Sequence, residues 1–116
     1  MPLSADLLRG HTETIILTQL MEKDSYGYEI NKNVQQRTNG ACSFREATLY
    51  TAIKRLETAG CITSYWGEDG PGARRRYYAI TDEGRKRWED NCREWKDTRD
   101  ALDALISLRG EGKKHE

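Results

Sequence analysis

An apolar stripe with the period of an α-helix runs through residues 46–60 and gives way at Gly60 to an alternation with a period of two. Leu49, Ile53 and Leu56 stand at positions i, i+4 and i+7, so they share one face of a helix. Gly60 is the residue type expected just past a helix end. Residues 62–66 and 76–80 then alternate in the manner of strands. The pattern predicts a helix followed directly by a β-hairpin.

The face of this helix opposite the stripe carries small hydroxyl groups and cations, without bulky apolar side chains. Such a face suits the DNA major groove, where Arg and Lys bind guanine or phosphate and Thr contacts base edges. An ordinary solvated helix face is the alternative interpretation. The residues on this face are Ala47, Thr48, Thr51, Lys54, Arg55 and Thr58.

The connection between the two predicted strands, residues 68–73, contains two glycines and one proline. It is too long for a two-residue hairpin turn and predicts a projecting tip. Glycines beside a strand also occur in phosphate-binding loops, but here no Gly-Lys-Ser/Thr follows and no helix begins, which disfavours nucleotide binding. The chain leaves the tip through three consecutive cations, Arg74, Arg75 and Arg76.

Helical periodicity also covers three other segments. The first covers residues 5–22. The second, which Ser25 can cap, runs to Arg37, and the third, which Thr81 can cap, runs to about Leu108. We expect a mainly α (α+β) fold, a winged helix-turn-helix with a two-stranded wing and a long C-terminal dimerisation helix. Residues 1–80 are expected to form the DNA-binding domain, with the first helix also contributing to the dimer, 81–109 the dimerisation helix and 110–116 a flexible tail.

The last predicted helix is mostly charged and has only a narrow apolar seam. Trp88, Trp95 and Leu102 follow one another at heptad spacing, and the other apolar positions lie beside them. A long helix with so narrow a seam usually needs a partner helix. We therefore predict a homodimer, which would present two reading helices to a palindromic DNA site.

The charge of the chain is balanced but unevenly distributed. Lys plus Arg total 19 and Asp plus Glu total 19, so the formal net charge is zero. A zero net charge counts against nucleic acid as a partner, because phosphate binding needs clustered cations. The cations, however, gather in the middle of the chain and the acids in the last helix. Double-stranded DNA remains the predicted partner, and a winged-helix module that binds protein instead is the alternative.

Other function classes find little support in the sequence. Cys42, Cys61 and Cys92 are widely spaced and form no CxxC pair, which argues against a metal site and for a reducing compartment. No segment approaches the roughly 18 apolar residues of a membrane span, and the N-terminus has no signal-peptide pattern, so a cytoplasmic location is expected. No nucleophile with a base and no paired carboxylates are recognisable. We therefore expect neither an enzyme nor a cofactor.

Several motifs give the chain a resemblance to the PadR family of bacterial winged-helix transcription regulators. They read SYGYEI at 25–30, ATLY at 47–50, KRLE at 54–57 and RRRYY at 74–78. The resemblance implies a dimeric repressor that leaves its operator when an effector binds, and it extends most closely to the small multidrug-binding members. Tyr50 is expected to contact phosphate or to position the helix, whereas Tyr28 is more typical of packing. The predicted DNA-binding residues are Arg45, Thr48, Tyr50, Thr51, Lys54, Arg55, Arg74 and Arg75.

An effector site is predicted on the last helix of the dimer. The resemblance implies that Trp95 and its symmetry mate stack on a flat aromatic molecule; dimer core is the alternative role. Arg99 lies one turn after Trp95, where the multidrug type has an acid, so planar aromatic anions are expected to bind better than cationic dyes. Pairing of Arg99 with a neighbouring acid is the competing interpretation. The predicted effector-binding residues are Trp95, Arg99, Leu7, Thr14 and Trp88.

Overall fold

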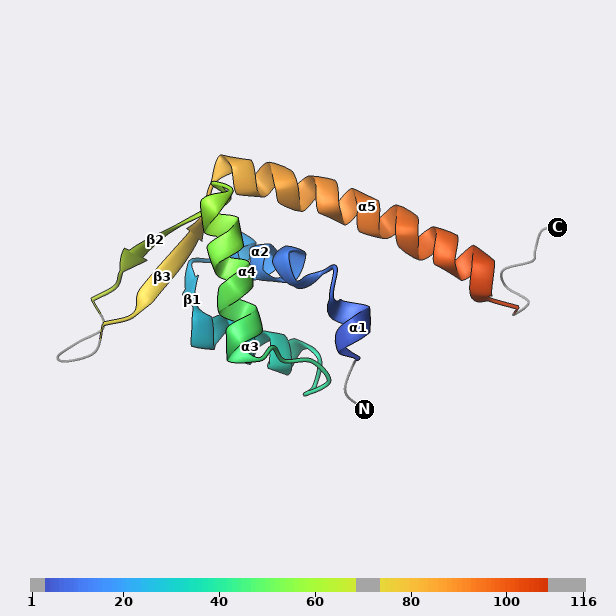
Figure 1. Cartoon of the computed structure of the whole chain (residues 1–116), viewed down its shortest axis with the longest axis horizontal. Coiled ribbons are helices and arrows are strands. Elements are labelled where there is room, and N and C mark those ends of the chain that lie inside the picture. Colours follow the sequence, from blue (N-terminus) through green and yellow to red (C-terminus); the bar gives the residue numbers. More distant parts are fainter. Residues whose placement is uncertain (1–3, 69–73, 109–116) are drawn as a thin grey trace.

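A computed structural model describes residues 4–68 and 74–108 of the chain. The predicted tip of the hairpin at 68–73, except for its first residue, and the predicted flexible tail at 110–116 lie outside these residues. Five helices and three strands follow one another within the described residues, and the longest helix extends away from the rest of the molecule (Figure 1). Their bounds are α1 Ala5–Leu8, α2 Thr12–Glu22, β1 Ser25–Tyr26, α3 Gly27–Arg37, α4 Glu46–Thr58, β2 Ile62–Trp66, β3 Arg76–Ile80 and α5 Asp82–Ile106.

The hydrophobic core lies where α2, α3, α4 and the sheet meet. Ile16 and Leu17 of α2, Ile30 of α3 and Leu56 of α4 are completely buried there. The predicted stripe of the helix at 46–60 is confirmed, because Leu49, Ile53 and Leu56 all belong to this core. Gly60 follows the end of α4 with a φ of +80°, a left-handed conformation that glycine adopts without strain.

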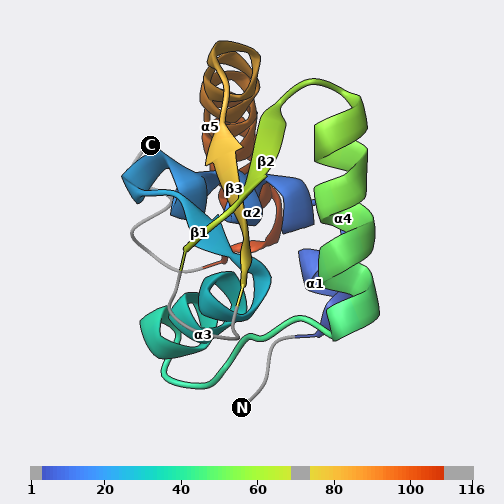
Figure 2. The same cartoon turned by 90° about the vertical axis from the view of Figure 1, so that its left-hand side faces the viewer.

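The two predicted strands pair as expected, but the sheet has a third strand. β2 and β3 run antiparallel, with Trp66 opposite Arg76, and β1 pairs with the other edge of β3. The expected two-stranded wing is therefore part of a three-stranded sheet with the order β1-β3-β2. Figure 2 shows α4 running alongside this sheet.

Two predictions about the first half of the chain are wrong. The expected single helix over 5–22 is divided into α1 and α2, because the His11 amide donates to the Leu8 carbonyl at 2.8 Å and closes a tight turn that contains Gly10. Ser25 is not the cap of α3; it is buried in β1 opposite Tyr78, and Tyr26 precedes the helix without a side-chain cap. Pairing with a strand some 50 residues away overrides the local capping signal.

The start of α5 agrees with the sequence. The Thr81 hydroxyl accepts a hydrogen bond from the Gly84 amide at 3.1 Å, and two acids occupy the first turn, where the helix dipole favours them. The helix ends at Ile106, close to the expected position. Its only fully buried residue is Gly84, and its C-terminal end carries exposed apolar side chains.

Candidate nucleic-acid interface

The exposed surface of α4 is the centre of the candidate site. The buried side of the helix, which includes Ala52, packs against α2, so the opposite side must face outward. Thr51 and Lys54 lie at the middle of that outward side, one turn apart, and both are exposed. Within the described residues Lys54 takes part in no ion pair, so its ammonium group is available to an external anion.

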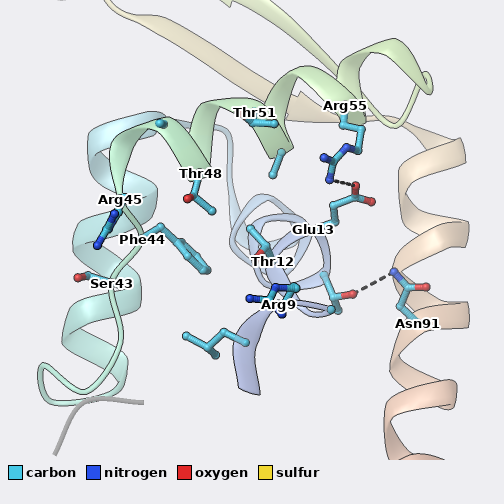
Figure 3. A pocket seen from close by; sticks show the side chains of 15 residues that line it. Arg9, Thr12, Glu13, Ser43, Phe44, Arg45, Thr48, Thr51, Arg55 and Asn91 are labelled. Carbon is cyan, nitrogen blue, oxygen red and sulfur yellow. Dashed lines mark hydrogen bonds and ion pairs between the residues drawn. The ribbon is translucent and has the colours of Figure 1, made fainter. Parts of the chain in front are cut away.

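One flank of α4 borders a hollow of about 960 Å³ between the helix and the N-terminal part of α2. Figure 3 shows Thr48, Thr51 and Arg55 of α4 beside this hollow, with Arg45 at the start of the helix and Glu13 across from Arg55. A carboxylate oxygen of Glu13 lies 3.7 Å from the guanidinium of Arg55. The lining is thus rich in hydroxyl and guanidinium groups, which are donors to phosphate oxygens.

The loop before α4 is held by a pair of hydrogen bonds to α3. The Asn31 side chain accepts from the Phe44 amide at 2.8 Å and donates to the Phe44 carbonyl at 2.9 Å. Phe44 itself is buried in the core. This clip fixes the position of Arg45, whose side chain is exposed directly beside the first turn of α4.

Tyr50 lies on the other flank of α4 and packs on the start of α3. A methyl group placed on Gly27 would lie 2.1 Å from the Tyr50 hydroxyl oxygen, so only glycine leaves room for this ring. Burial raises the pKa of Tyr50, and the charge of Glu46 raises it further. The phenol is therefore protonated at neutral pH and can donate a hydrogen bond.

The wing carries the three arginines, and two of them surround a tryptophan. The guanidinium carbons of Arg74 and Arg76 lie 5.2 and 5.8 Å from the centre of the Trp66 ring, and Arg75 lies 4.7 Å from the Tyr26 ring. Trp66 is 53% exposed. Sequence reasoning selected Arg74 and Arg75 but missed Trp66 and Arg76, although the strand alternation already placed these two on one face.

The predicted effector residues do not form one site within a single chain. Trp88 packs against the core of its own chain, and its indole nitrogen donates to the Thr18 hydroxyl at 2.8 Å. Trp95 is 42% exposed and meets the His11 ring edge-on at 5.0 Å. Of the five predicted residues only Thr14 lines the hollow beside α4, where it accepts a hydrogen bond from Asn91.

Neither Leu7 nor Arg99 lines the hollow beside α4. The Leu7 side chain is exposed on α1. Arg99 lies on the exposed part of α5, where its nearest acid, Asp100, is 3.9 Å away. This distance is long for an ion pair, and both side chains are largely exposed, so the pair holds the guanidinium only weakly.

One prediction about the surface is contradicted. Tyr28, expected to pack, is one of the most exposed aromatic residues, at the beginning of α3.

The described residues contain no group of three side chains that could hold a metal ion. Cys42 and Cys61 are buried, and burial raises the pKa of both thiols. In the described part of the chain, no helix is long and apolar enough to cross a membrane.

A helix with an exposed hydroxyl and cationic face, preceded by a second helix and followed by an arginine-bearing hairpin, defines a winged helix-turn-helix protein. The model of the transcriptional regulator PadR-like family matches residues 16–90. The chain therefore belongs to the PadR-like family of transcriptional regulators, and its relatives are regulators rather than enzymes.

Solved structures support this assignment, and one curated sequence is also similar to the chain. A transcriptional regulator from Clostridium thermocellum is 45% identical with a TM-score of 0.84, over 90% of this chain and 99% of the other. A PadR family transcription regulator from Clostridium difficile is 34% identical with a TM-score of 0.75, over 84% and 100% of the two chains. A protein of Lysinibacillus sphaericus, called uncharacterized protein X, is 39% identical over 88% of this chain and 94% of its own length.

Proposed function

We propose that this chain is a homodimeric transcriptional repressor that reads a palindromic operator with α4 and the wing. The observation that carries the proposal is the exposed face of α4, where Thr51 and Lys54 lie between a flank bearing Arg55 and a hairpin bearing Arg74 and Arg75. Cations at both sides of a narrow helix suit the two phosphate strands that border a major groove. Arg45, Thr48 and Tyr50 complete the proposed contact set.

Binding to the DNA upstream of the chain's own gene tests this function. We expect nanomolar to micromolar affinity at low salt that falls steeply as the salt concentration rises, because bound phosphates release counterions. Lys54→Ala should weaken binding by about 1–3 kcal/mol if Lys54 contacts a base or phosphate. Lys96→Ala is the matched control, since Lys96 is exposed on α5 and pairs with Asp100. Absence of DNA affinity at low salt would favour the protein-interaction module instead.

A second copy of the chain is the partner that we propose for α5. This helix makes the molecule 63 Å long, and its far end exposes apolar side chains that a single chain leaves in water. Leu105 is 78% exposed and Ile106 is 75% exposed. Burying such side chains against a partner would stabilise an assembly by about 1.5–3 kcal/mol for each large residue. A monomer in light scattering at micromolar concentration would contradict the proposal.

We also propose that the dimer binds a planar aromatic effector near Trp95, as the small multidrug-binding members of the family do. Leu7, Thr14 and Arg99 would line this site, and Trp88 would support it from the core. Because Arg99 has only a weak ion pair, its guanidinium is available to a carboxylate. Tryptophan fluorescence should therefore report tighter binding of a planar aromatic acid than of a planar cation.

The role of Trp95 is open to a direct test. Trp95→Ala should remain dimeric and bind DNA, but it should no longer bind the aromatic acid. If the variant is monomeric, Trp95 belongs to the dimer core, and the proposed effector site is wrong.

A further inference from the structure

The C-terminal end of α4 is tied to the wing by a compact polar cluster. One carboxylate oxygen of Glu57 accepts a hydrogen bond from the Ser64 hydroxyl at 2.8 Å and lies 3.6 Å from the guanidinium of Arg76. Arg76 in turn donates to the Ser64 hydroxyl at 3.1 Å. These contacts join the reading helix to both strands of the hairpin, in addition to the main-chain connection at Gly60.

The same cluster continues outward to the exposed indole of the wing. Trp66 lies two residues after Ser64 on the same face of β2 and directly opposite Arg76 on β3. Its ring is flanked by the guanidinium groups of Arg76 and Arg74. We call Trp66, Arg74 and Arg76 the wing edge. Glu57 thus holds the inner end of a continuous row of side chains whose outer end faces solvent.

We propose that Glu57 is a positioning residue that fixes the angle between the wing and α4, so that the wing edge contacts the DNA backbone beside the segment read by α4. This inference rests on the proposed function. Two guanidinium groups can bind phosphates, and the exposed indole that they flank adds an apolar surface beside them. Fixing these side chains before binding reduces the conformational entropy that the complex would otherwise lose.

The sign of the expected effect separates positioning from simple charge repulsion. An acid close to DNA repels phosphate, so its removal should strengthen binding if charge alone matters. Glu57 differs from an ordinary surface acid because Ser64 and Arg76 already satisfy its carboxylate. Removing its charge should loosen the wing edge and weaken binding. Glu46, an exposed acid in the first turn of α4, provides the contrast.

The experiment compares the DNA affinities of Glu57→Gln and Glu46→Gln on two duplexes from the upstream DNA. One duplex has the full length, and the other ends just beyond the half-site read by α4. We expect Glu57→Gln to lose at least about threefold in affinity on the long duplex and to reduce the salt slope by about 1, the equivalent of one phosphate contact. On the short duplex it should bind as well as the wild type. Glu46→Gln should bind both duplexes equally to or better than the wild type.

A measurement without DNA tests the positioning step by itself. In protein labelled with 5-fluorotryptophan, the ¹⁹F resonance of Trp66, assigned with Trp66→Phe, should shift in Glu57→Gln, while those of Trp88 and Trp95 should not. An unmoved Trp66 resonance, or equal behaviour of the two glutamate variants on the long duplex, would overturn the inference alone. Failure of the wild type to bind either duplex at low salt would overturn the proposed function and the DNA contact that depends on it.

Discussion

Replacing Gly84 with alanine should destabilise this protein, although the same change in most helices does the opposite. Gly84 is in the first turn of α5, where alanine is normally favoured over glycine by about 1 kcal/mol. Here a Cβ atom would lie 2.1 Å from the carbonyl oxygen of Cys61 and 2.8 Å from Cγ1 of Ile80. The close approach of the two backbones therefore requires a residue without a side chain.

The loss of stability in Gly84→Ala depends on which atoms must move to make room for the new Cβ. The Cys61 oxygen belongs to the backbone and accepts a hydrogen bond from the Thr81 amide at 3.0 Å, so no side-chain rotation can relieve the contact. Separation of the two atoms to van der Waals distance requires a shift of about 1 Å between α5 and the end of α4, and overpacking of this kind costs about 1–3 kcal/mol. Weakening of two of the hydrogen bonds of Thr81, those with Cys61 and Gly84, would add about 0.5–1.5 kcal/mol each. After subtraction of the helix propensity, we expect a net loss of about 1–5 kcal/mol.

Urea unfolding followed by circular dichroism measures this loss, with all variants at the same protein concentration because the stability of the proposed dimer would depend on it. Gly10→Ala is the control, since a Cβ at Gly10 would have no heavy atom within 4 Å. That variant should lie within about 0.5 kcal/mol of the wild type or slightly above it. A Gly84→Ala variant as stable as the wild type would refute the claim that α5 packs this closely on Cys61.

Three further outcomes follow from individual contacts. The Tyr65 hydroxyl donates to Asp24 at 2.6 Å, and this hydrogen bond raises the pKa of Tyr65 to about 12. The stabilising contribution of the hydrogen bond should therefore be complete below pH 10 and lost as the pH rises towards 12. Absorbance at 295 nm should show a late-titrating tyrosine that Tyr65→Phe removes. Gly27→Ala should displace the Tyr50 ring and lower the unfolding midpoint, and adding Tyr50→Ala should recover part of the loss. The buried Cys61 thiol, whose pKa is raised by burial, should react with a thiol reagent only as fast as the protein unfolds.

The elements that the sequence predicted correctly are those whose signal is local. The stripe of Leu49, Ile53 and Leu56 defines α4 without reference to the rest of the chain, and the alternation in 62–66 and 76–80 defines the hairpin. Thr81 caps α5 through an amide only three residues away. Periodicity and capping need only a few consecutive residues, so they can be read before any tertiary contact is known.

The features that were missed depend on contacts between distant segments. Ser25 resembles a helix cap, but its pairing with Tyr78 places it in a strand. Tyr50 packs on Gly27, which lies 23 residues earlier in the sequence. The helical pattern around Tyr50 gives no sign of this contact. The cations of the candidate site could be selected from the sequence because they are close together in it. The side chains that hold them, such as Glu57, can be identified only from the fold.

Helix α2 contacts both α4 and α5, and the two contacts differ in chemistry. Towards α4 it presents buried aliphatic side chains that belong to the core. Towards α5 it presents Glu13, Thr14 and Thr18, which bind Arg87, Asn91 and Trp88 at 3.3, 2.9 and 2.8 Å, and of these three partners only Trp88 also packs against the core. Each such polar contact contributes only about 0.5–1.5 kcal/mol, and water can replace it.

We expect the polar contacts between α2 and α5 to separate more easily than the apolar contact between α2 and α4. A ligand or partner acting on α5 should change the angle between α5 and α2 before it disturbs the apolar contact between α2 and α4. Glu13 lies at that seam and also next to Arg55, so loss of Arg87 from Glu13 would leave the carboxylate to hold Arg55 alone. A change at α5 would then reach the reading face of α4 as a change in the charge available to DNA, without any rearrangement of the core.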